Sequence, residues 1–410
     1  MESAMEDEHN KFMLEALAIA FRHMGNTSPN PSVGAVIARN GRVISSGGTC
    51  PWGSSHAEIV ALRNAGEDLK GADMYVTLEP CNHYGKTPPC TEAIISAGIS
   101  RVIIPMLDPN PMVAGKGVNR LRQEGVEVVV LHEMADCAAD LIRPFKKYIF
   151  RKRPFVIHKS AITLDGRIAT MSGDSKWISS DYSRYLVHRL RAKADAVIVG
   201  KQTFVQDNPS LTVRLDSYKQ DIVDYFSRGE CAISGRDNYF MRSLFSGEIG
   251  ECPQPLRVVV GLTGALDTGS SIFYDDNYVI YENESTLSEM IRGDSALKKT
   301  VTGLNIVPLP AENRQDSVTA VLEDLGSRGV MLALLEGGGT LAGSFMEAGE
   351  IDQFMYFITP RILGNGVSPI SGRGVDKIAD SLYLRDVSAM MVGDNLLYNG
   401  YRETYNFEMM

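Results

Sequence analysis

The chain has 410 residues, of which 44% are hydrophobic and 22% are charged, with 38 glycines and 18 prolines that follow no period. This composition predicts a globular protein of two or three domains and excludes collagen, coiled-coil and disordered classes. The formal net charge of -9 opposes broad attraction to nucleic acid. The acidic start MESAMEDEHN has no apolar signal region, and no apolar run is long enough to span a bilayer. We therefore expect a cytoplasmic protein with no nucleic-acid or membrane partner.

The first 150 residues alternate between expected helices and strands. A helix is expected over 10–24, followed by VGAVIA and RVIS around Asn40-Gly41, a pair that favours a type I′ hairpin. Three further helices, each stopped by a glycine that permits a left-handed turn, are expected over 57–65 before Gly66, over 91–97 before Gly98, and before Gly125. The strands MYVTL, RVIIP and EVVVL alternate with them. This order predicts a layered α/β sheet covered on both faces.

A cationic run near residues 143–154, RPFKKYIFRKRPF, breaks this rhythm, and we interpret it as a solvated linker or helix end rather than a binding patch. It separates a domain at 1–150 from a domain at 151–410. The second domain mixes the strands AVIVG, RVVVG, MLALL and FMYFI with helices around 181–194, 316–327 and 341–348. A polar stretch at about 215–255 is interpreted as an insertion, either an inert surface loop or a lid or oligomer contact.

The strongest motif combines His56, Cys81 and Cys90. One imidazole and two thiolates fill three positions of tetrahedral zinc and leave the fourth for water, as in catalytic sites. Water bound there titrates near neutral pH, and Glu58 is close enough in sequence to move protons between that water and a leaving amine. This is the H-x-E…P-C signature of zinc deaminases, although eight residues rather than two separate the cysteines.

Three plainer interpretations remain open. Ser55 and Glu58 match the capping-box pattern S-x-x-E, in which Glu58 only caps a helix. Cys81 and Cys90 fit the role of small buried hydrophobic residues. A non-catalytic zinc protein would need a closed four-ligand site, for which His83 is the nearby spare ligand.

The segment EPCNHYGKTPPC, with PNPSVGAVI upstream and DPNPMVAGKG downstream, resembles the deaminase half of the bifunctional riboflavin-biosynthesis deaminase/reductases of bacteria, in which the longer loop is typical. The resemblance implies a three-layer cytidine-deaminase-like domain, with zinc held by His56, Cys81 and Cys90 and with Glu58 as the proton shuttle. It also implies substrate contacts at Asn30, His83 and Lys86. For these three residues, turn chemistry or an ordinary loop side chain is the alternative.

The segment MLALLEGGGTLAG is typical of a buried strand, a glycine turn and a helix start, where free backbone N–H groups favour a phosphate. Gly337, Gly339 and Ala342 fit G-x-G-x-x-A, but an ordinary tight turn fits as well. Arg361 stands near the place where a dinucleotide fingerprint needs an acidic residue, so a Rossmann domain is not expected.

HKSAITLDGRIA, GDSKWISS and TFVQDNPSLTVR resemble, in this order, the reductase half of the same family. The resemblance implies a dihydrofolate-reductase-like domain that uses NADPH. The implied cofactor contacts are Ala161, Trp177, Thr203, Asp207, Gly338, Gly339, Thr340, Leu341, Ala342, Gly343 and Ser344. The implied substrate contacts are Ser175, Arg191, Leu211, Arg214 and Glu336.

The chemistry of several of these residues leaves alternatives. Arg191 and Arg214 can hold a phosphate through their guanidinium forks, or can form surface ion pairs. Lys159 and Asp207 are the candidate catalytic residues for ring opening or proton delivery, although Lys159 also fits a solvated charge at a strand end.

Three other positions bear on the same site. Asp165 with Gly166 favours a turn rather than a catalyst. Trp177 can simply pack. Gly261 stands where the family usually has an aspartate, next to an expected cofactor contact at Leu262.

The resemblance therefore implies a bifunctional enzyme of riboflavin biosynthesis. It would first deaminate 2,5-diamino-6-(5-phosphoribosylamino)pyrimidin-4-one with zinc hydroxide and then reduce the ribosyl group to a ribityl group with NADPH. The alternatives are a deaminase with a non-catalytic reductase-like domain, which Gly261 favours, and a deaminase of tRNA or nucleosides, which the lack of a basic aromatic stripe opposes. The expected partners are this small pyrimidine ribosyl phosphate and further copies of the chain in a homo-oligomer.

Overall fold

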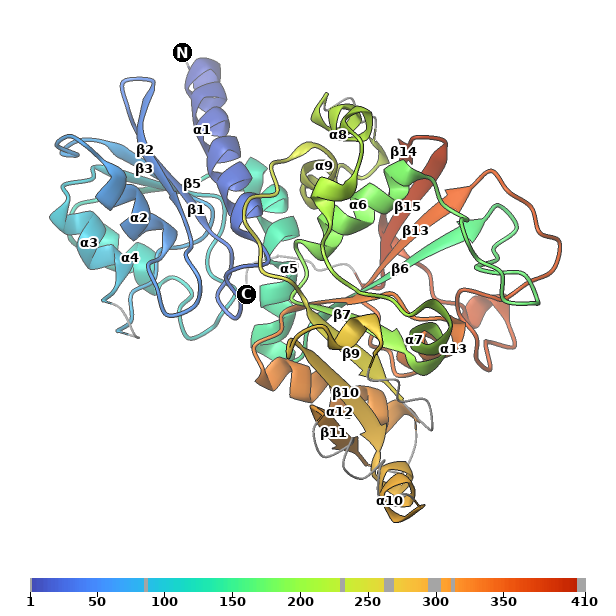
Figure 1. The fold of residues 1–410 in the computed structure, drawn as a ribbon. Helices are drawn as coiled ribbons and strands as arrows, with labels where there is room; N and C mark the ends of the chain where they lie inside the picture. Colours follow the sequence, from blue (N-terminus) through green and yellow to red (C-terminus); the bar gives the residue numbers. More distant parts are fainter. Residues whose placement is uncertain are drawn as a thin grey trace. The chain divides into compact units, whose positions relative to one another are not determined.

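The computed structural model describes residues 2–84, 88–228, 233–261, 269–293, 304–310 and 314–403 (Figure 1). The chain divides into two compact units. Among the described residues, unit 1 contains the chain up to Arg151 together with residues 238–253, and unit 2 contains residues 152–237 and those from Gln254 to Glu403. Part of the expected insertion thus folds with unit 1. No helix among the described residues has the length and apolar character needed to cross a membrane.

Unit 1 is built on a five-stranded sheet with the order β2-β1-β3-β4-β5. Its strands are β1 (Gly34–Arg39), β2 (Arg42–Gly48), β3 (Asp73–Val76), β4 (Arg101–Ile104) and β5 (Glu127–Val130). β1 is antiparallel to β2 and β3, whereas β3, β4 and β5 run parallel.

Helices cover both faces of this sheet (Figure 1). One face carries α1 (Glu2–His23) and α5 (Ala135–Arg151), the latter preceded by the short helix η1 (His132–Met134). The other carries α2 (Ala57–Asn64), α3 (Cys90–Ser96) and α4 (Lys116–Gln123). The expected three-layer α/β domain is confirmed.

Local turn chemistry explains most of these boundaries. Asn40 and Gly41 have φ values of 54° and 74°, as the type I′ hairpin requires. Gly98 and Gly125 adopt the left-handed conformation that ends a helix. The same expectation for Gly66 is wrong, because α2 ends when Ala65 turns to extended backbone and Gly66 needs no positive φ.

The cationic run at 143–154 is a helix end over most of its length, as one of the two interpretations held, and not a solvated linker. α5 continues through Pro144 to Arg151, although an interior proline removes one helical hydrogen bond. The side chain of Arg143 is only 2% exposed and pairs with Asp140 at 2.8 Å. Lys147 is also buried. Burial of one face of α5 therefore outweighs the local cost of the proline and the charges.

Unit 2 contains a ten-stranded sheet with the order β11-β10-β9-β7-β12-β6-β13-β15-β14-β8. From β11 to β13 all neighbouring strands are parallel, and the last three strands are antiparallel. The strands are β6 (Phe155–Thr163), β7 (Ala196–Gly200), β8 (Ile233–Gly235), β9 (Leu256–Val260), β10 (Tyr278–Asn283), β11 (Ile306–Leu309), β12 (Leu332–Leu335), β13 (Gln353–Thr359), β14 (Arg385–Val392) and β15 (Asn395–Tyr401). The carboxyl ends of the parallel strands share one edge, where ligands of such sheets bind.

The helices described in unit 2 are α6 (Asp181–Arg191), α7 (Lys201–Asp207), α8 (Gln220–Ser227), α10 (Glu284–Gly293), α12 (Arg314–Ser327) and α13 (Gly339–Glu347). Three short helices join them, namely η2 (Leu215–Ser217), η3 (Ser271–Phe273) and η4 (Ile378–Asp380). α12 and α13 pack on the central strands through Val321, Leu325 and Phe345, which are fully buried.

The stretch at 215–255 is not an inert loop. It forms η2, α8, β8 and the helix α9 (Tyr239–Ser246), and the apolar residues of the two α-helices are buried. Ile222 and Phe226 of α8 lie in unit 2, whereas Phe240 and Phe245 of α9 lie in unit 1. The stretch folds because these helices find apolar surfaces to cover, one on each unit.

Candidate active sites

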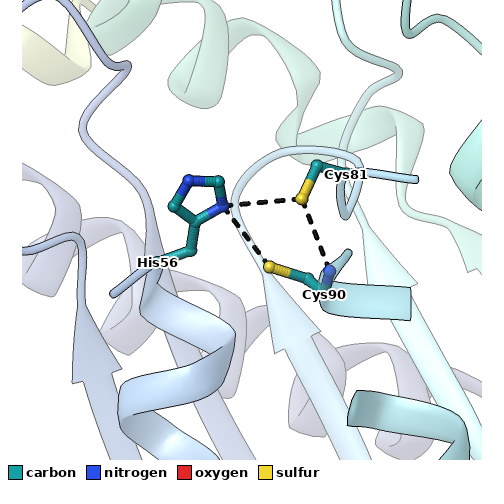
Figure 2. A group of neighbouring side chains, drawn as sticks. All are labelled: His56, Cys81 and Cys90. Atoms are coloured by element: carbon teal, nitrogen blue, oxygen red, sulfur yellow. Dashed lines mark hydrogen bonds between the residues drawn. The ribbon is translucent and has the colours of Figure 1, made fainter. Parts of the chain in front are cut away.

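Three elements of unit 1 bring His56, Cys81 and Cys90 together. His56 directly precedes α2, Cys81 lies in the loop after β3, and Cys90 is the first residue of α3 (Figure 2). The Nδ1 atom of His56 lies 3.5 Å from the Sγ atom of Cys81 and 3.4 Å from that of Cys90. Tetrahedral zinc with ordinary bond lengths would set such nitrogen and sulfur atoms about 3.6 Å apart. The three side chains therefore fit a zinc ion.

The electrostatics of this triad favour a thiolate. The backbone N–H of Cys90, at the start of α3, donates to the Sγ atom of Cys81 at 3.4 Å. The Cys90 thiol is the main cause that lowers the pKa of Cys81 to about 4, and His56 contributes to the shift. The side-chain hydrogen bond with Cys81 and burial raise the pKa of Cys90. Both sulfurs must lose their protons when a divalent cation binds, because thiolates are the ligands.

Glu58 lies in the first turn of α2, is 4% exposed and also interacts with the Cys90 thiol. Burial raises the pKa of its carboxyl group, and the charge of Cys81 adds to the shift. The capping-box alternative is wrong, because the N-cap is His56 and no side chain caps the helix. Ser55 instead accepts a hydrogen bond from Arg63 at 2.8 Å. Glu58 is free of a capping role and faces the cavity.

A cavity of about 280 Å³ opens beside the triad. His56, Glu58 and Cys81 line it, as do two of the predicted substrate contacts, Asn30 and His83. The third predicted contact, Lys86, lies outside the described residues. Among the described residues, the group able to hold a metal contains His56, Cys81 and Cys90 but not His83, so the closed four-ligand alternative finds no support there.

Sequence reasoning missed several residues of this cavity. The missed lining residues include Thr49, Trp52, Asp108, Asn110, Phe145 and Ile149. Burial raises the pKa of Asp108 to about 6. Asp108 and Asn110 belong to the DPNP motif, so a polar motif that follows a buried strand was the available signal.

Glu79 is a further residue of this cavity that sequence reasoning missed. It is 4% exposed, and its two carboxylate oxygens accept hydrogen bonds from the backbone N–H groups of Asp108, Gly115, Gly117 and Val118, at 3.2, 2.9, 2.9 and 3.1 Å. A carboxylate bound by several backbone donors is a strong anchor. Glu79 therefore fixes the loop that carries Asp108 and Asn110 to the cavity.

In unit 2 a cavity of about 480 Å³ lies at the carboxyl edge of the parallel strands. The predicted cofactor contacts Thr203, Gly338, Thr340, Leu341 and Ser344 line it. Lys201, Gln202, Asn283 and Ser317, which were not predicted, also line it. The predicted glycine-turn residues thus meet α7 and β10 around one space.

Three residues of the predicted turn support this cavity without lining it. A Cβ atom on Gly339 would lie 2.3 Å from the Ser368 carbonyl oxygen, and one on Gly343 would lie 1.6 Å from that of Ser371. Ala342 is fully buried in the core. These residues let α13 approach the 368–371 backbone closely rather than contact a ligand.

The start of α13 fits the phosphate groups of a dinucleotide. Gly338 is the N-cap residue, and its N–H donates to the Thr203 hydroxyl at 3.2 Å. No atom lies within 3.4 Å of the place where a Cβ of Gly338 would be, so the backbone is open there. The free N–H groups of the first helical turn attract anions. The cavity and its donor groups therefore match the NADPH that the sequence implied.

The other predicted cofactor contacts do not line this cavity. Ala161 lies on β6, two residues beyond Lys159 and on the same face. Trp177 is 64% exposed, with the Arg184 guanidinium 4.5 Å from its ring, so it does not simply pack into a core. Asp207 ends α7 and lies 3.7 Å from the Lys176 ammonium group.

Lys159, Arg191 and Glu336 form a largely buried polar cluster beside the glycine turn, with side chains that are 17%, 12% and 10% exposed. Arg191 holds Glu336 through two hydrogen bonds of 2.6 and 2.9 Å, and the Lys159 Nζ atom lies 3.9 Å from Glu336. Burial opposes ionisation of Glu336, but the charge and hydrogen bonds of Arg191 outweigh it and lower its pKa to about 2. Burial lowers the pKa of Lys159. Lys159 is therefore not a solvated strand-end charge.

The guanidinium fork of Arg191 is occupied by a carboxylate, which differs from the expected phosphate contact. Arg214 donates to the hydroxyl groups of Ser210 and Thr212, and it is exposed. Leu211 is buried between them with a φ of 53°, and Ser175 lies in a turn closed by the Ile178 N–H. Arg214 thus remains the more available of the two guanidinium groups.

The predicted turn at Asp165 and Gly166 behaves as ordinary structure. Asp165 accepts hydrogen bonds from the N–H groups of Leu363 and Gly364, which together with the Thr163 hydroxyl lower its pKa to about 2. Gly166 has a φ of 75°, so the turn interpretation is confirmed. Gly261 also has a positive φ, of 82°, and its neighbour Leu262 lies outside the described residues.

Comparisons with known proteins cover both units. Residues 154–398 match the model of the RibD C-terminal domain, and residues 6–106 match that of the cytidine and deoxycytidylate deaminase zinc-binding region. The riboflavin biosynthesis protein RibD of Aquifex aeolicus is 35% identical over 94% of this chain and 96% of its own length. RibD of Escherichia coli is 34% identical over 92% and 94%.

Solved structures agree with these matches. Acinetobacter baumannii RibD has a TM-score of 0.76 and 29% identity, with 97% of this chain and 99% of that chain covered. The diaminohydroxyphosphoribosylaminopyrimidine deaminase/5-amino-6-(5-phosphoribosylamino)uracil reductase of Thermotoga maritima has a TM-score of 0.75 and 31% identity, with the same coverage. The similarity therefore extends over both halves of the chain.

Proposed function

Because the chain belongs to the RibD family of bifunctional riboflavin-biosynthesis enzymes, we propose that unit 1 deaminates 2,5-diamino-6-(5-phosphoribosylamino)pyrimidin-4-one and that unit 2 reduces the ribosyl group of the product to a ribityl group. The observation that carries this proposal is the geometry of His56, Cys81 and Cys90 beside a cavity that also contains Glu58. A hydrolytic deaminase needs this combination of metal ligands and a buried proton carrier.

In unit 1, His56, Cys81 and Cys90 are the zinc ligands. Zinc, when bound, lowers the pKa of water and thus makes a nucleophile available near neutral pH. Glu58 takes a proton at its carboxylate and later delivers it to the departing amine, a role for which a raised pKa is suited. The buried position of Glu58 keeps bulk water from competing for that proton.

The remaining residues of this cavity hold the pyrimidine. Asn30, His83, Asp108 and Asn110 offer hydrogen-bond donors and acceptors to its polar edges. Lys86 supplies a point charge for the phosphate in our proposal. Glu79 positions the Asp108 loop through its four backbone hydrogen bonds.

In unit 2, the turn from Gly338 to Ser344, with Thr203, Ala161, Trp177 and Asp207, is the proposed cofactor contact surface. NADPH, when bound, supplies the electrons and hydrogen that reduce the sugar. Lys159 gives a proton from Nζ to the opening ribose ring, because burial lowers its pKa while the Glu336 carboxylate, 3.9 Å away, holds the ammonium group in place. Arg214, Ser175 and Leu211 face the substrate, and Arg191 orients Glu336.

A two-stage assay tests the proposal. Purified protein is incubated with the diaminopyrimidine phosphate, first without and then with NADPH. Ammonia release and the absorbance of NADPH are followed in both stages. We expect ammonia release without NADPH and cofactor oxidation only after deamination. Absence of ammonia release from zinc-loaded protein contradicts the first activity. Ammonia release without later cofactor oxidation favours the non-catalytic reductase alternative.

The buried Lys159, Arg191 and Glu336 cluster supports a working reductase over a mere scaffold, because an unused buried ion cluster is costly.

The cytoplasmic location and the homo-oligomeric state stay predictions. Light scattering on the purified protein tests the oligomeric state.

A further inference from the structure

Residues 238–253, here the 238–253 segment, fold with unit 1 although the chain on both sides of them belongs to unit 2. Its helix α9 packs against α1 and α5. Phe240 and Leu244 are 3% and 0% exposed, and the Phe240 ring centroid lies 6.2 Å from that of Phe21 in α1. α9 therefore contributes to the core of unit 1.

A buried polar anchor fixes the start of α9. Asn238 is fully buried, and its side chain caps the helix by accepting a hydrogen bond from the Met241 N–H at 2.9 Å. The Tyr239 N–H donates to one carboxylate oxygen of Asp140 in α5 at 2.9 Å. The other oxygen of Asp140 binds Arg143 at 2.8 Å. Because a buried polar network tolerates few alternative arrangements, it sets the position of α9 on α5.

The 238–253 segment is also held at both ends by unit 2. Before it, the Arg236 N–H donates to the Val387 carbonyl at 2.9 Å. After it, the Gln254 side chain accepts a hydrogen bond from the Val213 N–H at 2.7 Å. The segment leaves and re-enters unit 2 at defined points and does not continue as a free tail.

α5 lies between α9 and the deaminase cavity. Asp140 faces α9, whereas Phe145 and Ile149 line the cavity. With about 3.6 residues per turn, Asp140 falls on the opposite side of the helix from these two residues. A shift of α5 caused by the loss of α9 would therefore displace one wall of the cavity.

We propose that the 238–253 segment is a positioning element for deamination. It folds with unit 1, although the chain before and after it belongs to unit 2. It holds α5 through the Tyr239 to Asp140 hydrogen bond and the apolar face of α9, and so holds Phe145 and Ile149 against the substrate. Asp140 is a positioning residue, not a catalytic one. This inference rests on the proposed deaminase function of unit 1.

The sharpest test compares Tyr239→Pro with Tyr239→Ala in the full chain. Proline removes the N–H that binds Asp140, yet it suits the first helical position, and Asn238 already has the extended φ and ψ of -118° and 111° that a residue before proline needs. Alanine removes the same ring but keeps the N–H. We expect Tyr239→Pro to raise the KM for the diaminopyrimidine phosphate about five-fold above that of Tyr239→Ala, with kcat and zinc content equal.

A second pair of variants enlarges the effect. Phe240→Ala with Leu244→Ala removes the apolar contact of α9, whereas Phe226→Ala removes a buried phenylalanine from α8 of the same inserted stretch but in unit 2. We expect the first variant to raise the deaminase KM about ten-fold or more and to speed hydrogen exchange in α5, and the second to leave both unchanged. Bound zinc should stay at the wild-type level in both.

The outcomes separate this inference from the proposed function. If α9 exchanges faster in the double variant while the deaminase KM stays at the wild-type value, the positioning role is overturned. Equal KM values for Tyr239→Pro and Tyr239→Ala overturn the part assigned to the Asp140 hydrogen bond. If the wild-type protein itself releases no ammonia, the proposed function fails, and hydrogen exchange still reports whether α9 holds α5.

Discussion

The two candidate sites differ in how the chain assembles them. In unit 1, His56, Glu58, Cys81 and Cys90 come from consecutive elements, and each contact within this group is local in the fold. In unit 2, the cluster of Lys159, Arg191 and Glu336 joins residues that are far apart in the sequence. For a local motif, the sequence predicts both the residues of the site and their geometry. For a cluster of distant residues, the sequence can indicate the residues but not which of them pair.

The largest effect is expected from Glu58→Gln, which should remove the deaminase activity and leave the reductase activity. The amide cannot accept and return the proton, so ammonia release should fall by about 100- to 10,000-fold. Bound zinc and the reduction of deaminated substrate should not change, because the metal ligands and unit 2 are intact. Metal analysis and the two separate assays check this result, and an active Glu58→Gln enzyme rules out the shuttle.

Lys159→Met makes the opposite separation. It removes the proton carrier from the buried cluster while keeping a long apolar side chain, so cofactor oxidation should fall by about 100-fold and deamination should be unchanged. The measurement is steady-state NADPH oxidation with deaminated substrate. If the rate drops less than a few-fold, Lys159 serves only the ion cluster, and Asp207 becomes the residue to test.

Glu336 links the reductase cluster to acid stability. Its pKa in the folded protein is lowered to about 2 from 4.5, so its contribution is complete above about pH 4.5 and is lost as the pH falls toward 2. Glu336→Gln should reduce the free energy of unfolding by about 3 kcal/mol at neutral pH. Urea unfolding at pH 7, 5 and 3, roughly, should show the difference from wild type shrinking at the lowest pH. A pH-independent difference contradicts the assignment.

Glu79→Gln tests whether the deaminase cavity depends on its loop as well as on its metal ligands. The amide can accept fewer of the four backbone hydrogen bonds, so the Asp108 loop should loosen and the deaminase KM should rise about ten-fold. Amide exchange at Gly115 and Gly117 should accelerate. An unchanged KM with faster exchange would show that the loop does not position the substrate.

The smallest effect is expected from Ser55→Ala. A true capping box would lose about 1 kcal/mol of stability on this change. Because Ser55 only accepts a hydrogen bond from Arg63 here, the free energy of unfolding should change by less than about 0.5 kcal/mol. Thermal unfolding of the two proteins side by side measures it, and a loss near the full capping value would restore the capping interpretation of Glu58.

The same contrast explains what the sequence allowed us to predict. Asn40-Gly41, Gly98 and the H-x-E…P-C pattern report on neighbours in the chain, and the hairpin, the helix end and the triad geometry follow. The pairing of Arg191 with Glu336 forms only when a helix packs on the sheet. From the sequence alone, Arg191 had no visible partner, and we therefore predicted that it contacts a phosphate. Glu79 is an acidic residue that follows an apolar strand, which is a recognisable signal. Its role could not be predicted because it depends on the loop whose backbone N–H groups it binds.

The 215–255 stretch marks the limit of pattern reasoning. Its helices α8 and α9 are short. Their apolar residues indicate that each helix packs against another part of the protein, but not against which part. Only tertiary packing assigns α8 to one unit and α9 to the other. The expected division at residue 150 treats the two domains as consecutive stretches, whereas the described chain passes from one unit to the other after residues 151, 237 and 253.

The path of α9 has a consequence for anyone who divides this gene. A fragment that stops after Arg151 contains every ligand of the triad, but it leaves bare the surface of α1 and α5 that Phe240, Leu244 and Phe245 cover in the intact protein. Exposed apolar patches of this kind promote aggregation. Expression of the first half alone should therefore yield insoluble material unless the α9 sequence is grafted onto it or supplied as a separate peptide.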